Sequence, residues 1–295
     1  MTSNSSRTII AQVDSFPALP ATVSRIMDIT ADPESSAQDL MNAILPDQSI
    51  CVTLLKIANS AFFGLPRQVS SIDKAVMVLG FDEIRNIVLG KAVFNSFHDL
   101  YRNNKQVIDH FWYHSFICGL AAKLLSEEHT VSPSEGFIAG LIHDIGKLAM
   151  LMSLNSDYAH VLEETEPLEF RTLLKEQELY AISHDDVGYR LLKRWLFPIE
   201  LVNAIGYHHR PQECPDSKLL PSIIQIADML SIFHCSEDAV SMQEITRIVD
   251  DFFPETRALW RECGLECNEE NLQRWSEELT ISAQRDNGIL SIISS

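Results

Sequence analysis

The middle of the chain reads Leu141-Ile142-His143-Asp144-Ile145-Gly146-Lys147-Leu148. Its apolar residues belong to a stripe that repeats every three or four positions between Ile138 and Met152, which is the spacing of one buried face of an α-helix. The pair His143-Asp144 puts two polar groups into this apolar helix, where burial is costly unless a partner compensates for it. We therefore predict a continuous buried helix here, with a polar partner or a metal beside the pair.

Helical spacing extends outward from this stretch to nearly the whole chain. A second stripe is formed by Ile50, Leu54, Ile57, Ala58 and Ala61. Ser132 and Ser183 each precede an acidic residue by three positions, as at the start of a helix. The residues Gly64, Gly80 and Gly264 indicate helix ends. Because strand-type alternation is absent from the sequence, we predict an all-α fold, a multi-helix bundle.

Composition limits the classes of partner. The chain has 295 residues, of which 46% are hydrophobic and 22% charged, as in ordinary soluble globular proteins. A net charge of −18 would repel a phosphate backbone, so we expect no nucleic-acid partner. We find no segment near the roughly 20 consecutive apolar residues that a membrane span needs, and we expect no membrane partner and a cytoplasmic location. The six cysteines lack a Cys-x-x-Cys pair and are expected to be reduced and structural.

The predicted organisation has four parts. Residues 1–11 form a polar, disordered tail, and residues 12–104 form an N-terminal helical subdomain. Residues 105–235 form a second helical subdomain that contains the polar pair, and residues 236–295 form a C-terminal helical extension. The boundary between the two subdomains is expected in the polar stretch Tyr101–Lys105.

Imidazoles and carboxylates recur within otherwise apolar helical segments between residues 114 and 228. The candidate metal ligands are His114, His143, Asp144, His184, His208, His209 and Asp228. Asp228 lies in the centre of an apolar helix, where a carboxylate needs a cation or several donors to stay ionised. His114 has the alternative of an ordinary hydrogen-bonded core histidine. His184, His208 and His209 have the alternative of surface histidines, and adjacent helical residues point about 100° apart, so at most one of His208 and His209 should face inward unless the helix end unwinds.

Three further residues have predicted roles near the site. Gly146 has no side chain and would make room for a ligand next to the pair. Lys147 shares a helix face with His143 and Asp144 and could reach an anion bound there, or could instead be a solvated lysine. His110, one turn before His114, is expected at the rim of the site rather than among the ligands.

The order of these residues resembles that of a known superfamily. His114, His143-Asp144 and Asp228 are similar to the H…HD…D pattern of the HD superfamily of metal-dependent phosphohydrolases. The additional residues His184 and His208-His209 resemble the extra ligands of its HD-GYP branch, which binds two or three metals. That branch has a Gly-Tyr-Pro loop, whereas Arg210-Pro211-Gln212 follows His209 here. Hydrolysis of cyclic di-GMP is therefore not expected.

The N-terminal half resembles the HDOD family over roughly residues 12–215. The similar segments are Phe16-Pro17-Ala18-Leu19-Pro20, Asp47-Gln48-Ser49, the stretch from Leu54 to Ala61 that ends in Asn59-Ser60-Ala61, and the stretch from Ser71 to Gly80. The resemblance implies an HD-domain-like helical core with an N-terminal helical subdomain, in a bacterial signalling or regulatory protein. Many members have lost their HD ligands and act as interaction modules, whereas this chain retains every one.

Two functions follow from these expectations. In the first, the chain is a regulatory protein whose metal site is structural or ligand-sensing, with a signalling protein partner and a small phosphate-containing ligand as its expected partners. In the second, it is a phosphohydrolase for a nucleotide-like substrate, with Asp144 bridging two metals and Lys147 neutralising developing charge. One or two divalent transition metals are expected, and iron, manganese, zinc and nickel all suit these ligands.

Overall fold

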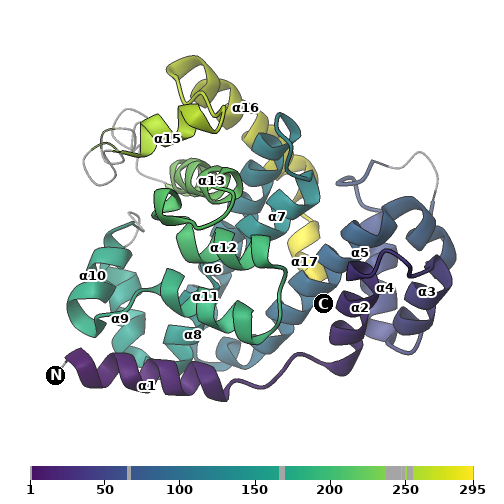
Figure 1. The fold of residues 1–295 in the computed structure, drawn as a ribbon, viewed down its shortest axis with the longest axis horizontal. Coiled ribbons are helices and arrows are strands. Elements are labelled where there is room, and N and C mark those ends of the chain that lie inside the picture. Colours follow the sequence, from purple (N-terminus) through teal and green to yellow (C-terminus); the bar gives the residue numbers. More distant parts are fainter. Residues whose placement is uncertain are drawn as a thin grey trace. The chain divides into compact units, whose positions relative to one another are not determined.

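A computed structural model describes residues 2–64, 68–165, 170–236, 247, 250 and 255–294. Every regular element within these ranges is a helix (Figure 1), which confirms the predicted all-α fold. The chain divides into two compact units. Unit 1 comprises residues 1–18 and 103–280, and unit 2 comprises residues 19–102 and 281–295.

Unit 2 is a small group of helices around an apolar core. Its elements are α2 (Ala21–Ala31), α3 (Ala37–Ile44), α4 (Gln48–Ala58), α5 (Ile72–Ser96), the short 3-10 turn His98–Leu100 and α17 (Ile289–Ser294). Gly80 has a φ of 79°, so the helical path bends inside α5 where the sequence predicts a helix end. Asn59, at the end of α4, donates to the carbonyls of Leu55 and Val69 and accepts from the Val69 N–H, each at 2.8 Å. The segment around Asn59 therefore has a structural role.

Unit 1 contains most of the remaining helices. They are α1 (Thr2–Ser15), α6 (Tyr101–Glu127), α7 (Pro133–Ile142), α8 (Ile145–Leu154), α9 (Ser156–Thr165), α10 (Phe170–Tyr180), α11 (His184–Arg194), α12 (Ile199–Tyr207), α13 (Leu219–Cys235), α15 (Thr256–Glu262) and α16 (Glu269–Asp286). Helix α11 packs against both α8 and α12, and α13 packs against α7 and α12 (Figure 1). The first residues of α6 and the last residues of α16 fall in unit 2.

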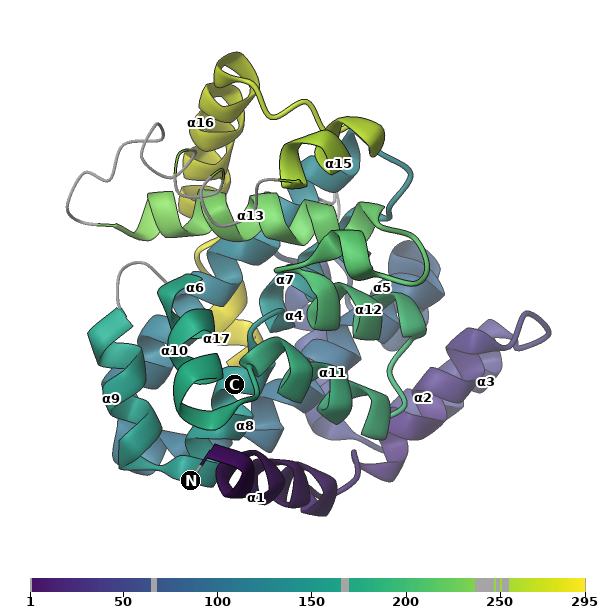
Figure 2. The ribbon, with the colours of Figure 1, turned by 60° about the vertical axis from the view of Figure 1, so that its left-hand side comes forward.

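The N-terminus differs from the disordered tail expected for residues 1–11. Residues 2–15 form α1, which packs against α8, α10 and α11 (Figure 2). Ile9 and Val13 lie one turn apart and are completely buried, and Asp14 forms a bidentate ion pair with Arg190 of α11. The apolar stripe on α1 is too short to stand out among the polar residues around it, so only its tertiary contacts identify it as a helix.

The C-terminal stretch also differs from the single extension expected for residues 236–295. Helix α15 and most of α16 belong to unit 1, where Arg274 pairs with Glu128 at the end of α6. Residues 281–294 belong to unit 2, where Lys91 Nζ donates to the carbonyl of Ile293 at 3.4 Å. Residues 237–246 of the expected extension lie outside the described ranges.

One apolar stretch is longer than the sequence analysis allows. Residues Pro133–Leu154, which comprise α7 and α8, meet the length and hydropathy criteria for a membrane-spanning helix. However, 83% of the apolar window is buried within the protein. Burial of this kind is typical of the core helices of a protein, and most side chains of this stretch are buried.

Candidate metal centre

The pair His143-Asp144 lies at a break between two helices. Helix α7 ends at Ile142 and α8 begins at Ile145, so the predicted continuous helix is wrong at this point. Asp144 has φ −97° and ψ 13°, outside the helical range, and occupies the N-cap position of α8. Both side chains are almost completely buried, with 0% of His143 and 1% of Asp144 exposed. The break places the two polar side chains in the interior of unit 1.

All seven candidate ligands converge there from three helices, α6, α11 and α13, and from two turns, the one between α7 and α8 and the one after α12. They form two clusters, one of His114, His143 and Asp228 and the other of Asp144, His184, His208 and His209. In each cluster, one potential ligand atom of every residue lies within 4.8 Å of the others. Every member is buried. We call these the first cluster and the second cluster.

Asp144 faces both clusters with different oxygen atoms. Its Oδ2 lies 3.2 Å from His143 Nε2 and 4.0 Å from His114 Nε2 of the first cluster. Its Oδ1 lies 3.1 Å from His184 Nε2 and 3.8 Å from His208 Nε2 of the second cluster. This is the arrangement of a carboxylate that can bridge two cations.

The first cluster is completed by Asp228 in the middle of α13. Its Oδ1 lies 3.1 Å from His114 Nε2 and 3.5 Å from His143 Nε2. Burial alone would raise the pKa of the Asp228 carboxyl, but His114 and His143 outweigh this effect and hold the pKa well below its usual range. Asp228 is therefore an ionised carboxylate inside an apolar helix, and its charge is balanced by its neighbours.

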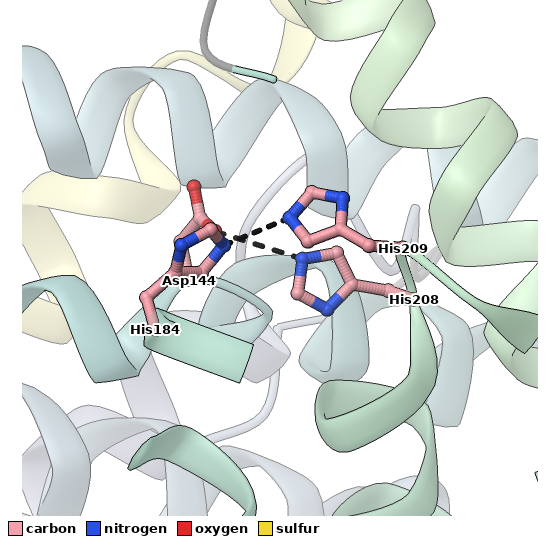
Figure 3. A group of neighbouring side chains, drawn as sticks. All are labelled: Asp144, His184, His208 and His209. Carbon is pink, nitrogen blue, oxygen red and sulfur yellow. Dashed lines mark hydrogen bonds and ion pairs between the residues drawn. The ribbon is translucent and has the colours of Figure 1, made fainter. Parts of the chain in front are cut away.

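The second cluster depends on the end of α12. That helix ends at Tyr207, and the following turn allows both His208 and His209 to face Asp144 and His184 (Figure 3). The expectation that at most one of the two would face inward holds only for an intact helix, which has ended here. His209 Nε2 lies 2.8 Å from His184 Nε2, so these imidazoles present nitrogens to the same point.

Hydrogen bonds at Nδ1 fix which nitrogen of three histidines faces the clusters. His143 Nδ1 lies 2.8 Å from the carbonyl of Gly140, and His208 Nδ1 lies 2.7 Å from the carbonyl of Ile205. His184 Nδ1 lies 2.8 Å from a carboxylate oxygen of Glu176. Because a carbonyl and a carboxylate can only accept, Nδ1 carries the proton in each case. In the neutral rings Nε2 is then a lone-pair donor directed into the clusters.

Several of these atoms suit a cation. The Nε2 atoms of His143 and His208 and the Oδ1 atoms of Asp144 and Asp228 are buried and make no hydrogen bond of acceptable geometry. A buried polar atom left without such a bond costs about 1–3 kcal/mol. The separations of 2.8–4.0 Å among the clustered atoms match neighbouring ligands on one ion, since each ligand lies about 2.1 Å from it. The residues present therefore fit divalent metals.

The charge balance of the clusters leads to the same conclusion. Burial would lower the pKa of His184, but the carboxylates of Glu176 and Asp144 outweigh burial and raise the pKa to about 10. Burial and the neighbouring His143 lower the pKa of His208 to about 4. Protons on some imidazoles thus balance the buried carboxylates, and a cation bound at the same nitrogens would replace them.

Gly146 and Lys147, which follow the pair, have surroundings that differ in part from those predicted. A Cβ atom on Gly146 would lie 1.8 Å from the carbonyl oxygen of His184. Gly146 therefore makes room for the backbone at the start of α11, and the expectation that it makes room for a ligand is wrong. Lys147 is not a solvated lysine, because only 4% of it is exposed and its Nζ lies 2.5 Å from Asp144 Oδ2.

Lys147 also forms part of the wall of a pocket. The pocket has a volume of about 70 Å³ and is lined by apolar side chains such as Phe111 and Leu162, with Thr165 and Thr172. His110 lies on its wall, is exposed and belongs to neither cluster, so it occupies a rim position. The pocket thus extends to a lysine that contacts Asp144.

Glu176 contacts the second cluster and was not among the residues predicted from the sequence. This residue of α10 is completely buried and accepts hydrogen bonds from both Nδ1 and the backbone N–H of His184 at 2.8 Å. The only signal in the sequence is that Thr172, Glu176 and Tyr180 are spaced four residues apart, on the face of α10 that is buried. That spacing places a charged residue on a core face, but it does not identify the histidine it contacts.

The chain matches a protein family and a relative of known sequence. The HDOD domain family matches residues 16–211, which is more than half of the chain. An uncharacterized protein of Treponema pallidum (strain Nichols) is 24% identical over 250 residues. That match covers 83% of this chain and 47% of the relative, so the chain spans about half the relative's length.

Solved structures share the fold over nearly the whole chain. An HDOD domain protein of unknown function from Geobacter sulfurreducens has a TM-score of 0.74 at 23% identity and covers 99% of this chain and 98% of its own. A candidate phosphohydrolase from Shewanella amazonensis SB2B has a TM-score of 0.70 at 20% identity, with 98% of each chain covered. A candidate signal transduction protein from Marinobacter aquaeolei VT8 has a TM-score of 0.72 at 21% identity, with 100% of this chain and 66% of its own covered. These likenesses concern the fold. The family match spans the N-terminal segments and six of the seven clustered histidines and aspartates, and it establishes that the chain belongs to the HDOD domain family.

Proposed function

We propose that this protein is a bacterial signalling or regulatory HDOD protein that binds two divalent metal ions, one in each cluster, and through them a small phosphate-containing ligand. The observation that carries the proposal is the position of Asp144, whose two oxygens face two different sets of buried nitrogen and oxygen donors. A shared carboxylate between two ligand sets is the usual basis of a two-metal site.

The ligand chemistry limits which metals fit. Imidazoles and carboxylates without a thiolate suit iron, manganese, zinc and nickel. When bound, such ions act as Lewis acids that attract phosphoryl oxygens and lower the pKa of a bound water. The nitrogen of Lys147, which is held against Asp144, is placed to neutralise negative charge on a ligand that enters through the adjacent pocket.

Hydrolysis of a phosphate ester is the second candidate function. It is favoured by the proximity of Lys147 to the carboxylate that faces both clusters, since both residues would act on the same phosphoryl group. In that case Asp144 would hold the reacting centre in place, and Lys147 would stabilise the charge that develops in the transition state. A nucleotide-like phosphomonoester or phosphodiester is the proposed substrate class.

A signalling protein partner and a cytoplasmic location belong to the same proposal. Support for a partner comes from exposed apolar side chains on unit 2, including Leu45, Met77 and Val78, which are 55%, 72% and 49% exposed. Support for a reducing compartment comes from the six cysteines, all of which are free thiols.

Metal analysis of purified protein tests the proposal. Wild-type protein reconstituted with manganese or zinc should hold two ions per chain, and Asp144→Asn should lose at least one, because the amide removes the shared negative charge. The matched control is Asp157→Asn, an exposed aspartate of α9 outside both clusters. Equal metal content in wild type and Asp144→Asn would contradict the two-metal site.

Activity measurements separate the two functions. The same proteins, loaded with manganese or iron, should be incubated with a panel of nucleotides and phosphodiesters. Turnover that Asp144→Asn abolishes and Asp157→Asn retains would establish hydrolysis. Binding of phosphate-containing ligands without turnover would support the regulatory function.

A further inference from the structure

Glu176 contacts the second cluster without being one of its ligands. Its Oε2 accepts from His184 Nδ1 and from the His184 backbone N–H, each at 2.8 Å, and its Oε1 accepts from the hydroxyl of Tyr158. Glu176, His184 and Tyr158 are all completely buried. Each oxygen of the carboxylate is therefore occupied by a hydrogen bond, and none of the clustered ligand atoms belongs to Glu176.

The partner at Nδ1 distinguishes His184 from two other histidines of the clusters. His143 and His208 donate to main-chain carbonyls, whereas His184 donates to a full negative charge. A carboxylate partner fixes the tautomer and orientation of an imidazole and makes its other nitrogen a stronger donor to a metal. His184 Nε2, which lies 3.1 Å from Asp144 Oδ1, is thus the nitrogen that gains most.

The charges of the two clusters also differ. The first cluster contains the carboxylate of Asp228 and has Asp144 Oδ2 beside it, while the second contains three imidazoles and Asp144 Oδ1. Asp144, which also faces the first cluster, is the one carboxylate among the clustered ligands of the second cluster. Glu176 adds a negative charge that acts on this cluster through His184 Nδ1.

On the basis of the proposed metal binding, we propose that Glu176 is a positioning residue that selectively strengthens metal binding in the second cluster by holding His184. Tyr158 supports it by occupying Oε1, which keeps Oε2 directed at His184. The chain of contacts runs from α9 through α10 to the first residue of α11. Loss of the carboxylate charge should weaken the second cluster and leave the first cluster unchanged.

The test is a metal titration of metal-free protein with cobalt, followed by the visible absorption of the bound ion and by calorimetry. Glu176→Gln should weaken binding of one of the two ions by about 10–100-fold, the usual cost of losing such an outer carboxylate, with the other ion unaffected. Tyr158→Phe should show a smaller loss at the same ion. The matched control is Glu178→Gln, an exposed glutamate on the same helix, which should bind both ions as wild type does.

A second comparison separates positioning from a merely structural role. In a His184→Ala background, Glu176→Gln should cause no further loss of metal affinity, because the residue it acts through is gone. Unchanged binding of both ions by Glu176→Gln would overturn the inference, as would equal weakening of both ions or an additional loss in the His184→Ala background. If Glu176→Gln binds both ions as wild type does, the two-metal proposal stands and only this inference fails, whereas wild-type protein that binds no cobalt would overturn both.

Discussion

Asp144 and Gly146 show how single residues build the site. Asp144 could be selected from the sequence because a carboxylate beside a histidine in an apolar stretch needs compensation. The role of Gly146 could not, because the atom it accommodates, the His184 carbonyl oxygen, lies 38 residues further along the chain. Glu176 was missed for the same reason, since its importance comes from the histidine it contacts. The residue type indicates which side chains can bind a metal. Tertiary contacts determine which other residues hold those side chains in position.

Gly146→Ala tests the close approach of α8 and α11. The added methyl group would overlap the His184 carbonyl, so the helices must separate, and we expect a loss in the free energy of unfolding of about 3 kcal/mol or more. Metal content should fall as well, because His184 moves. Denaturant unfolding measures the loss.

The control for this change is Gly288→Ala, where an added Cβ meets no atom within 4 Å. It should leave stability within about 0.5 kcal/mol of wild type. Equal stability of Gly146→Ala and wild type would contradict the described contact between the two helices.

At the scale of elements, most helices could be predicted because apolar residues repeat at helical spacing. The errors arise where that local pattern conflicts with tertiary structure. The stripe from Ile138 to Met152 continues across His143-Asp144, yet the chain breaks there and forms α7 and α8. In α1 the local pattern is too weak rather than too strong. Ile9 and Val13 alone do not indicate a helix, and the contacts of α1 with α8 and α11 stabilise it. The spacing of apolar residues indicates which face of a helix is apolar, but it does not indicate which other helices cover that face.

The end of α11 offers a prediction at this scale. Leu196 has a φ of 59° and is 79% exposed, and the hydrogen bonds from Phe197 N to Leu192 O and from Leu196 N to Lys193 O define a Schellman motif. Glycine adopts this conformation without the strain that a branched side chain incurs. Leu196→Gly should therefore raise the free energy of unfolding by roughly 0.5–1 kcal/mol, measured by thermal or denaturant unfolding.

Lys193→Gly, three residues earlier, should instead lower the free energy of unfolding. Lys193 lies in the last helical turn of α11, where glycine costs about 1 kcal/mol. A lower stability for Leu196→Gly than for wild type would mean that the end of α11 is not built as described.

At the scale of the whole molecule, the predicted helical class and family are correct, whereas the predicted sequential division of the chain is not. Residues 1–18 belong to the same unit as residues 103–280, and residues 281–295 belong to the same unit as residues 19–102. A division read along the sequence assumes that each unit is one continuous segment, and here both units take segments from two places. All seven ligands, on α6, α11 and α13 and on the two turns, nevertheless lie in unit 1.

The two-metal proposal requires that Asp144 be shared by two ions in unit 1. Electron paramagnetic resonance of protein loaded with manganese tests it most directly, because two ions that share a carboxylate are magnetically coupled. We predict the spectrum of a coupled pair for wild type and its loss in Asp144→Asn. A wild-type spectrum of isolated ions, unchanged by that substitution, would contradict the account.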